Sequence, residues 1–281
     1  MSKKIKIKKY SGKIVDFDKN KLIKSLKNSE ADEELIQNIL KEIQGKLYDG
    51  ISTKKIYQMA YKMLNKAKSK PFASRYKLKK AIMELGPSGF PFERFVAAIL
   101  SQEGFKTEVG IIIQGYCVTH EVDVVAKNEH KHFMVECKYH NRQGRVNDVK
   151  IPLYIQSRFL DIDKQCKIDE GHQSKFHQGW IYTNTRFSSE AIKFGKCAGL
   201  KLVSWDYPAN HSLKDQINKH HLFPITVLTN LTKNDKTKLL EKGIVLCKEL
   251  NKNPQLLTEV GIDRSKHKKI LEQSECLCKS L

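Results

Sequence analysis

The sequence lacks any apolar run long enough to cross a bilayer, and its lysine-rich N-terminus lacks the apolar centre of a signal peptide. Acidic residues are scarce as well: 31 Asp and Glu face 51 Lys and Arg, which gives a formal net charge of +20. A field of that sign favours polyanions, namely nucleic acid, nucleotides or an anionic membrane surface. We therefore expect a soluble, cytoplasmic protein that binds an anionic ligand and does not enter a membrane.

The cysteines lack the spacing of a disulfide framework or a zinc site. There are seven, an odd number, and they are scattered along the chain. Cys276 and Cys278 alone are close together, and no partners stand at metal-ligand spacing from them. The sequence therefore favours reduced, mostly structural thiols.

Linker signals divide the chain into three segments. The chain has 281 residues, enough for two or three domains with sizeable cores. The run GPSGFP at residues 86–91 is the clearest linker signal, and Pro208 with the polar stretch Asn210–Lys219 marks a second boundary. We predict a multi-domain α/β protein with domains at residues 1–86, 88–207 and 220–281.

Two short β-rich runs in the middle of the chain, Glu121–Ala126 and His132–Lys138, flank a polar turn. This pattern predicts a hairpin whose tip is centred on Glu129 and His130. Because side chains alternate between the faces of a strand, one face should be wholly apolar. Its members are Val122, Val124, Ala126, Phe133, Val135 and Cys137.

The opposite face of the predicted hairpin is charged. The register sets Asp123 opposite Glu136 and Glu121 opposite Lys138, with Cβ atoms about 4.5–5.5 Å apart. Two carboxylates that close repel each other unless a proton or a cation lies between them. Oxygen ligands with room for water suit Mg²⁺ or Mn²⁺. The pattern indicates a metal site beside Lys138, while an amphipathic hairpin with its charged face in water stays open as the alternative.

The N-terminal segment predicts a small α+β unit. Two short runs, Ile5–Lys9 and Ile14–Phe17, surround a Ser11-Gly12 turn, and four helical patterns follow, the last from about Pro71 to Leu85. The stretches KKYSGKIVDFDKNKLIKSL, YDGISTKKIYQMAYKML and ASRYKLKKAI resemble an ATP-cone, the small nucleotide-binding regulatory domain found at the front of ribonucleotide reductases and in their transcriptional repressor. The resemblance covers residues 3–85.

The resemblance to ATP-cones implies ATP or dATP as an effector. It implies that Lys9 and Lys21 contact the nucleotide phosphates, since triphosphates need compensating cations, and that Ile7 packs against the base. Further nucleotide contacts are implied for Asp18, Thr53 and Tyr57. Tyr10 stands where an arginine is common and Val15 where an acidic residue often reads adenine, so base selectivity stays open. Without the resemblance, Lys9 and Lys21 would be two among many surface lysines.

The central segment has the predicted order α-β-β-β-α-β-α-β, a mixed sheet flanked by helices. Val122-Asp123, twelve residues, then Glu136-Cys137-Lys138 fits the D…ExK core of the PD-(D/E)xK nucleases. The stretches FERFVAAILSQEGF and GWIYTNTRFSSEAIKFGKCAGLKLVSWD resemble the first helix and the closing β-α-β of their Mrr-like restriction endonuclease branch. The resemblance covers about residues 88–207.

The nuclease resemblance implies a role for each residue of this pattern. Asp123, Glu136 and the carbonyl group of Cys137 would bind Mg²⁺ or Mn²⁺, Glu93 would complete the metal site, and Lys138 would orient the attacking water. The basic loop after the hairpin would touch DNA phosphates through Arg142 and Arg145. The non-catalytic alternatives are that Lys138 pairs with Glu121 across the strands, that Glu93 is a solvated acid in the first turn of its helix, and that the loop of Arg142 and Arg145 is solvated.

The histidines of the hairpin have no predicted catalytic role. By default we expect polar surface, with substrate contact as the alternative and zinc the least favoured. The residues concerned are His120, His130, His132 and His140.

The C-terminal segment contains two similar phrases, LLEKGI at residues 239–244 and LLTEVGI at residues 256–262, each between helical patterns. They resemble paired helix-hairpin-helix units, in which glycine turns offer backbone N–H groups to DNA phosphates. A plain helical bundle or an oligomerisation module is an equal alternative.

Together these patterns predict a nucleotide-regulated, divalent-metal-dependent DNA endonuclease of the restriction or phage-defence kind, which we expect to assemble as a homo-oligomer. The alternatives are a non-catalytic ATP- or dATP-responsive DNA-binding regulator, or a nuclease of RNA or branched DNA.

Overall fold

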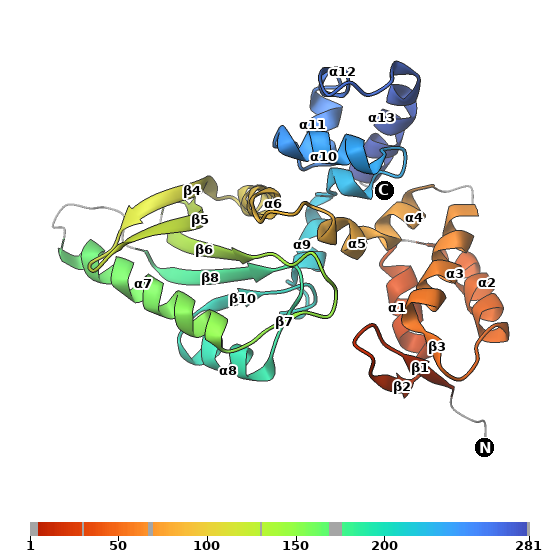
Figure 1. Cartoon of the computed structure of the whole chain (residues 1–281), viewed down its shortest axis with the longest axis horizontal. Helices are drawn as coiled ribbons and strands as arrows, with labels where there is room; N and C mark the ends of the chain where they lie inside the picture. Colours follow the sequence, from red (N-terminus) through yellow and green to blue (C-terminus); the bar gives the residue numbers. More distant parts are fainter. Residues whose placement is uncertain (1–4, 30, 67–69, 130, 169–175, 280–281) are drawn as a thin grey trace.

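The computed structural model describes residues 5–29, 31–66, 70–129, 131–168 and 176–279. Three groups of elements are visible in Figure 1: a small sheet with helices around the N-terminus, a larger sheet covered by helices on both faces, and a set of C-terminal helices. The chain is thus a mixed α/β, multi-domain protein. The tip of the predicted hairpin at His130 lies outside the described residues.

The N-terminal group is a three-stranded sheet with four helices. Its sheet order is β2-β1-β3, in which β1 is antiparallel to β2 and parallel to β3. The elements are β1 (Lys6–Lys8), β2 (Ile14–Asp16), α1 (Lys19–Lys27), α2 (Glu33–Gly45), β3 (Ile51–Ser52), α3 (Thr53–Lys66) and α4 (Lys70–Tyr76). The side chains of Asp18 and Asp32 cap the first two helices by accepting backbone N–H groups. Aliphatic side chains of α1, α2 and α3 form a separate core.

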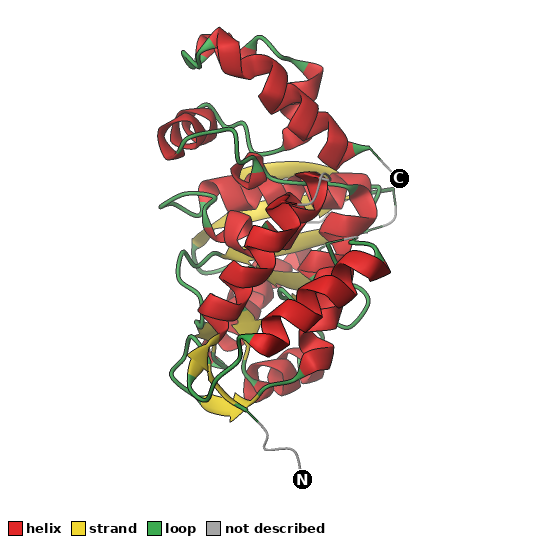
Figure 2. Cartoon of the chain, turned by 90° about the vertical axis from the view of Figure 1, so that its right-hand side faces the viewer, coloured by secondary structure: helices red, strands yellow, loops and turns green. Residues whose placement is uncertain are grey.

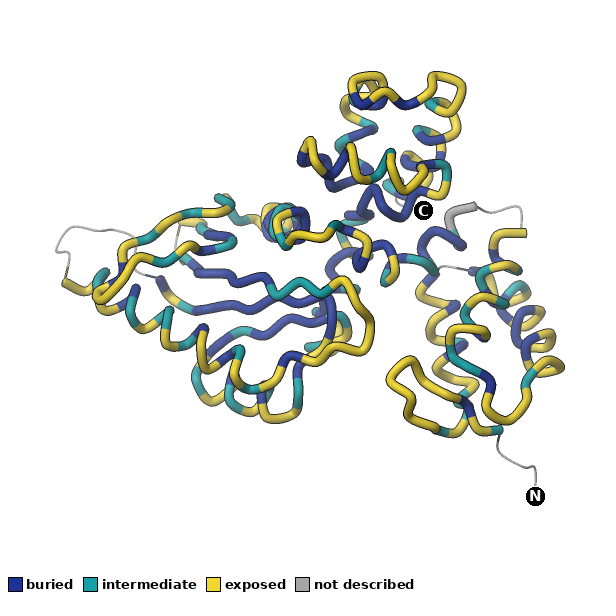
Figure 3. The backbone as a smooth tube through the Cα atoms, viewed as in Figure 1, coloured by how far each residue is buried: buried dark blue, intermediate teal, exposed yellow. Residues whose placement is uncertain are grey.

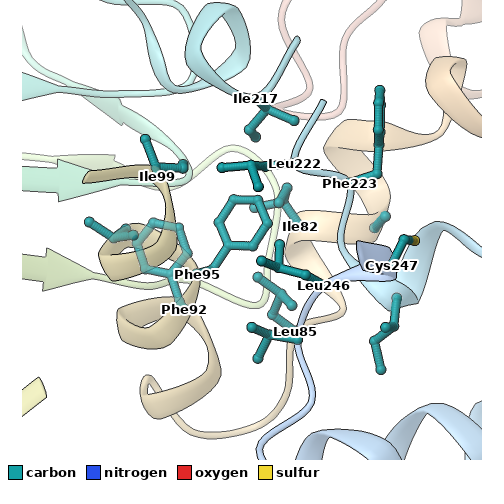
Figure 4. Packing of buried hydrophobic residues seen from close by; sticks show 14 of the residues in the cluster. Ile82, Leu85, Phe92, Phe95, Ile99, Ile217, Leu222, Phe223, Leu246 and Cys247 are labelled. Carbon is teal, nitrogen blue, oxygen red and sulfur yellow. The ribbon is translucent and has the colours of Figure 1, made fainter. Parts of the chain in front are cut away.

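The single helix expected from Pro71 to Leu85 is two helices, α4 and α5 (Leu78–Met83), with a break at Lys77. The buried side chains of α5 do not join the N-terminal core. Ile82 and Leu85 instead pack with Phe92 and Phe95 of the next helix, as Figure 4 shows. The linker signal at residues 86–91 therefore falls inside one continuous core.

The larger sheet has the order β10-β8-β6-β5-β4, with β4, β5 and β6 antiparallel and β6, β8 and β10 parallel. Helix α6 covers one face, and α7 and α8 cover the other (Figure 1). The elements are α6 (Phe90–Gln102), β4 (Lys106–Gln114), β5 (Thr119–Lys127), β6 (His132–Lys138), β7 (Val146–Asn147), α7 (Lys150–Ile168), β8 (Gln178–Thr183), β9 (Arg186–Phe187), α8 (Ser189–Cys197) and β10 (Lys201–Val203). The short strands β7 and β9 pair with each other. The predicted element order is present, and the middle strands are the most deeply buried (Figure 3).

The first two strands of this sheet change faces halfway along. Val124 packs in the core under α6, whereas Val122 packs in the core under α7, although two residues that far apart in a regular strand share a face. Between these two residues, Asp123 stands opposite Gly110 of β4, whose φ of +66° interrupts the regular alternation of the strand. The prediction that Val122 shares an apolar face with Val124 is therefore wrong.

The polar stretch expected as a second boundary is a buried helix, α9 (Leu213–His220). Leu213, Gln216 and Ile217 face the core, and Ser212 and Asp215 form a capping box. The remaining elements are a 3₁₀ turn, η1 (Ile225–Val227), and α10 (Lys233–Glu241), α11 (Cys247–Lys252), α12 (Leu256–Glu259) and α13 (Arg264–Cys278). Among them, η1 packs against α5 and α13 packs against α4. In Figure 2, which keeps the vertical axis of Figure 1, the C-terminal helices stand at the top.

The two glycine phrases of the C-terminal segment end α10 and α12. Gly243 and Gly261 both have positive φ. Ile244 and Ile262 donate their N–H groups to the carbonyl groups of Leu239 and Leu257, which closes each helix with a Schellman turn. These N–H groups are thus used within the chain. The expectation that the turns offer them to DNA phosphates is wrong, and the helical-bundle alternative fits the contacts.

None of the seven cysteines forms a disulfide. Cys137 and Cys247 are buried, but Cys117, Cys197 and Cys276 are exposed, so a structural role holds for only some of them. Among the described residues, no helix is both long and apolar enough to cross a membrane.

Candidate functional site

The carboxyl group of Asp123 lies where β5 parts from β6. The described ladder between these strands runs from the Lys127–His132 pair to the Val124–Val135 pair, which is the predicted register. One step further, where Asp123 faces Glu136, a side-chain bond replaces the backbone ladder: the Asp123 carboxylate accepts the N–H of Cys137 at 2.6 Å. The kink opposite Gly110 is at the same place. The sheet therefore opens at the predicted acidic pair.

Glu136 is almost fully buried and is bound by two cations. Its carboxylate forms ion pairs with Lys138 and with Arg158 of α7. Arg158 also donates to the carbonyl oxygen of Glu121. Lys138 is thus paired, but with Glu136 and not, as the alternative had it, with Glu121. Its side chain keeps 28% of its surface exposed, so it forms the open side of the cluster.

The predicted catalytic residues form one electrostatic cluster. Burial and the nearby charge of Glu136 raise the pKa of Asp123 to about 6. Burial, followed by the charges of Asp123, Glu121 and Glu136, raises the pKa of Glu93 on α6 to about 7. The structure therefore brings Glu93, Asp123, Glu136 and Lys138 close enough to perturb one another, although they come from three elements.

Oxygen donors of this kind suit Mg²⁺ or Mn²⁺. A bound cation would stabilise the ionised form of carboxylates whose pKa values are raised by burial and by one another. Still, no three His, Cys, Asp or Glu side chains of the described chain are arranged to hold a metal ion. Asp123 is engaged with a backbone N–H, and Glu136 is engaged with Lys138 and Arg158. The Cys137 thiol is buried and its pKa is raised, which leaves its carbonyl group as the oxygen donor of interest. These carboxylate and carbonyl oxygens fit a hard divalent cation, which would replace one of the two ion pairs of Glu136.

Two hollows on the described surface are lined by residues outside this cluster. One, of about 300 Å³, is lined by residues of α6, β4, α11 and the segment before α11, among them Arg94 and Glu249. The other is lined by residues at the far end of the sheet, among them Lys106 and Lys127.

A buried polar network behind β6 was not predicted. Asn147 donates to Thr183 and Thr185 at 3.1 and 3.2 Å, and Thr183 donates to the carbonyl group of Lys138 at 2.7 Å. The ring of His140 bonds Asn147 at 2.9 Å. This network holds the end of β6 and with it the backbone of Lys138. The pairs that form it are 36–45 residues apart in sequence, apart from His140 and Asn147, so no local pattern indicated it.

The histidines of the hairpin are structural where they are described. His140 belongs to the network just described, His120 bonds Asp161 at 2.7 Å, and His132 stacks on Phe176 with ring centroids 4.1 Å apart. The default expectation of polar surface is therefore wrong for these three. The contact with His120 and two backbone N–H groups also lowers the pKa of Asp161 to about 2.

The implied nucleotide contacts lie around the first strands. Ile7 is buried on β1, and Lys9 is exposed at the turn that follows, where its N–H donates to Lys13. The parallel pairing of Lys8 with Ser52 places Lys9 next to Thr53. Asp18 is the N-cap of α1 and also pairs with Lys21 at 3.4 Å, which gives both residues a structural role.

Tyr57 lies on α3 and is half-buried. It stacks on Tyr76 with ring centroids 4.9 Å apart, and burial raises the pKa of its hydroxyl group. That hydroxyl is buried without a hydrogen-bond partner in the structure. An unsatisfied buried hydroxyl group costs free energy, so it would gain from a polar ligand atom.

Arg142 and Arg145 are exposed on the loop between β6 and β7. This loop reaches the N-terminal sheet: a side chain on Gly144 would meet the Tyr10 ring at 3.6 Å. The two arginines therefore stand next to the turn that carries Lys9.

Comparison with known proteins agrees with this division. Residues 5–83 match the family model of the ATP-cone domain, which confirms that prediction, and residues 223–278 match that of the AF1548-like C-terminal domain. An uncharacterized protein of Archaeoglobus fulgidus is 34% identical over 181 residues, which are 64% of this chain and 98% of that protein. The crystal structure of AF1548, a protein of unknown function, superposes with a TM-score of 0.56 at 33% identity over 67% of this chain and 97% of that one.

A further similarity is too low to carry an argument. Can2 from Sulfobacillus thermosulfidooxidans, in complex with cyclic tetra-adenylate, gives a TM-score of 0.34 at 16% identity, over 72% of this chain and 54% of that one. The relatives of high coverage are shorter than this chain, since they match about two thirds of it over nearly their whole length. The chain therefore has an ATP-cone domain and belongs to the family of AF1548-like proteins.

Proposed function

We propose that this protein is a divalent-metal-dependent nuclease of the PD-(D/E)xK, Mrr-like kind that acts on DNA and is regulated by ATP or dATP. The observation that carries the proposal is the cluster of Glu93, Asp123, Glu136 and Lys138 where β5 parts from β6. Acid side chains with raised pKa values beside a lysine are typical of a site that handles protons and phosphate charge. The match to the ATP-cone family supports the regulatory part.

The chain offers distinct groups for each part of phosphodiester hydrolysis. Asp123, Glu136, Glu93 and the carbonyl group of Cys137 would hold Mg²⁺ or Mn²⁺, which when bound polarises the phosphodiester and lowers the pKa of a water molecule. The ammonium group of Lys138 would donate to a phosphate oxygen or orient the nucleophile. Arg142 and Arg145 would bind backbone phosphates beside it. Cleavage of both strands requires two such centres, which is why we propose a homo-oligomer.

Plasmid nicking tests this proposal. Supercoiled plasmid is incubated with Mg²⁺, with and without ATP or dATP, and with wild-type protein, Asp123→Ala or Lys138→Ala. We expect metal-dependent nicking that both variants lose. Lys127→Ala is the matched control, because Lys127 is also a lysine of this hairpin but pairs with Glu108 away from the cluster. Nicking retained in either site variant, or lost equally in the control, contradicts the assigned roles.

A second function is favoured by one observation. Glu136 is buried against both Lys138 and Arg158, so its charge is already balanced within the chain. That arrangement suits a non-catalytic, nucleotide-responsive regulator that binds DNA through its basic surface. Tight plasmid binding without nicking in Mg²⁺ or Mn²⁺ would support this function. The same assay with RNA and with branched DNA tests the other substrate classes.

A further inference from the structure

The basic loop of the larger sheet and the turn of the ATP-cone meet face to face. Gly144 lies against the ring of Tyr10, which is itself two-thirds exposed, and Figure 1 shows the β6–β7 loop beside the β1–β2 turn. Gly144 has a φ of +87°, so the loop turns sharply at the point of contact. Consecutive Cα atoms are about 3.8 Å apart, so Arg145 and Lys9 lie one residue from this contact on either side.

The charges at this contact all have one sign. Lys9 and Lys13 close the turn, and Arg142 and Arg145 come from the loop. All four are exposed, and none of them forms an ion pair with another residue of the described chain. Unpaired cations gathered on one surface favour a polyanion as ligand.

The two lysines implied as phosphate contacts of the ATP-cone differ in their partners. Lys21 is paired with Asp18 at 3.4 Å, whereas Lys9 forms no ion pair with another described residue. Guanidinium groups bind phosphate oxygens in a bidentate manner, so two arginines at the edge of this site would add contacts that lysines cannot make.

We propose that Arg142 and Arg145 complete the phosphate site of the ATP-cone, so that a bound nucleoside triphosphate bridges the β1–β2 turn and the β6–β7 loop and withdraws both arginines from nucleic acid. The first half stands independently of catalysis. The second half rests on the proposed function, because it concerns the nucleic acid that the same arginines would bind. Nucleotide and nucleic acid then oppose each other, and by linkage each weakens the other's binding by the same factor.

Nucleotide affinity in the full-length protein tests the first half without any DNA. Equilibrium titrations with ATP and with adenosine compare wild type, Arg142→Ala/Arg145→Ala and Arg264→Ala/Lys268→Ala, a control that removes the same charge from exposed positions of α13. We expect the loop variant to lose about tenfold or more in ATP affinity and nothing in adenosine affinity, because only the phosphates are contacted. An unchanged ATP affinity, or the same loss in the control, overturns the proposal.

Binding of a short DNA duplex in EDTA tests the second half. We expect saturating ATP to weaken DNA binding by wild type and to leave the residual binding of the loop variant unchanged. ATP that strengthens wild-type binding overturns the antagonism. A protein that never cuts DNA would still show the loss of ATP affinity in the loop variant, so the failure of the proposed nuclease activity and the failure of this inference are distinguishable.

Discussion

At the scale of single residues, Asp123 makes stability depend on pH in an unusual direction. Its pKa is raised from 3.8 to about 6 in the folded chain, so the folded chain holds this proton more tightly than the unfolded chain does. The free energy of unfolding therefore falls as pH rises from about 4 to about 6 and stays lower above that range. This carboxylate favours folding less when it is charged.

Asp123→Asn should consequently stabilise the protein in metal-free buffer. Asparagine keeps an oxygen that can accept the Cys137 N–H but cannot ionise. We expect the free energy of unfolding at pH 8 to rise by about 1–3 kcal/mol, and the difference from wild type to vanish near pH 4. Urea denaturation at both pH values measures this, with the exposed Glu129→Gln as control. A destabilisation that is equal at pH 4 and pH 8 would contradict the assignment.

Arg158 neutralises the buried carboxylate of Glu136 from α7, and its removal should make the free energy of unfolding depend on Mg²⁺. Arg158→Gln leaves Glu136 buried with Lys138 as its remaining cation. We expect a loss of about 2–3 kcal/mol in EDTA, part of which Mg²⁺ restores because it replaces the missing charge. Thermal melts with and without Mg²⁺ measure this. If Mg²⁺ stabilises wild type and variant equally, no metal ion replaces the Arg158 charge.

The register that points Asp123 towards Glu136 was predictable because a strand repeats every two residues and the turn fixed the pairing of β5 with β6. Arg158 was not, because it reaches Glu136 from a helix that begins twelve residues beyond β6. Side-chain contacts between elements depend on how a helix is rotated on the sheet. Sequence spacing alone does not contain that rotation.

At the scale of elements, the two Schellman turns offer a controlled comparison. Gly261 has a φ of +71°, and a Cβ added there would meet only the Lys238 ammonium group, at an ordinary contact distance of 3.8 Å, so Gly261→Ala should cost about 1–2 kcal/mol from backbone strain. Gly243→Ala should cost more, because its Cβ would also displace the guanidinium group of Arg94. Gly45→Ala near the end of α2 is the control and should stabilise by a few tenths of a kcal/mol to about 1 kcal/mol. Denaturant titrations rank the three, and equal costs at Gly243 and Gly261 would exclude a role for Arg94.

Helix α9 was expected as a domain boundary because of its polar composition. Helix α9 is rich in polar residues, yet Leu213 and Ile217 stand one helical turn apart and its capping box is readable. Its polar composition suggested a linker. In the fold, one of these polar residues, Gln216, is buried, because its amide accepts the Tyr182 hydroxyl and donates to the carbonyl group of His211. Composition reports average polarity, whereas burial here depends on a few positions.

At the scale of the whole molecule, the net charge of +20 should make nucleic-acid binding strongly dependent on salt. The logarithm of the binding constant should fall linearly with the logarithm of KCl concentration, with a slope of about −0.9 for each phosphate neutralised. Arg142→Ala/Arg145→Ala should make the slope shallower by about 2. Fluorescence anisotropy of a labelled duplex over a KCl series measures it, and an unchanged slope would place both arginines away from DNA.

Helix α5 ties the nucleotide-binding end of the chain to the sheet. Its Met83 carbonyl group accepts the Tyr139 hydroxyl at 2.7 Å, directly after Lys138, and its Ala81 carbonyl group accepts the Thr226 hydroxyl at 2.7 Å. Gln273 of α13 reaches back to Ser74 of α4. These hydrogen bonds connect α4 and α5 with the residue that follows β6, the strand of Glu136 and Lys138, and with the C-terminal helices.

The shared core around α5 has a practical consequence for anyone who wishes to work with pieces of this protein. Truncation at the linker signal near residue 86 would separate Ile82 and Leu85 from Phe92 and Phe95, and each fragment would expose an apolar surface to water. Such fragments should self-associate. A cut near Lys77, where the helices break, leaves that surface with its partners and is the better place to begin a truncated version.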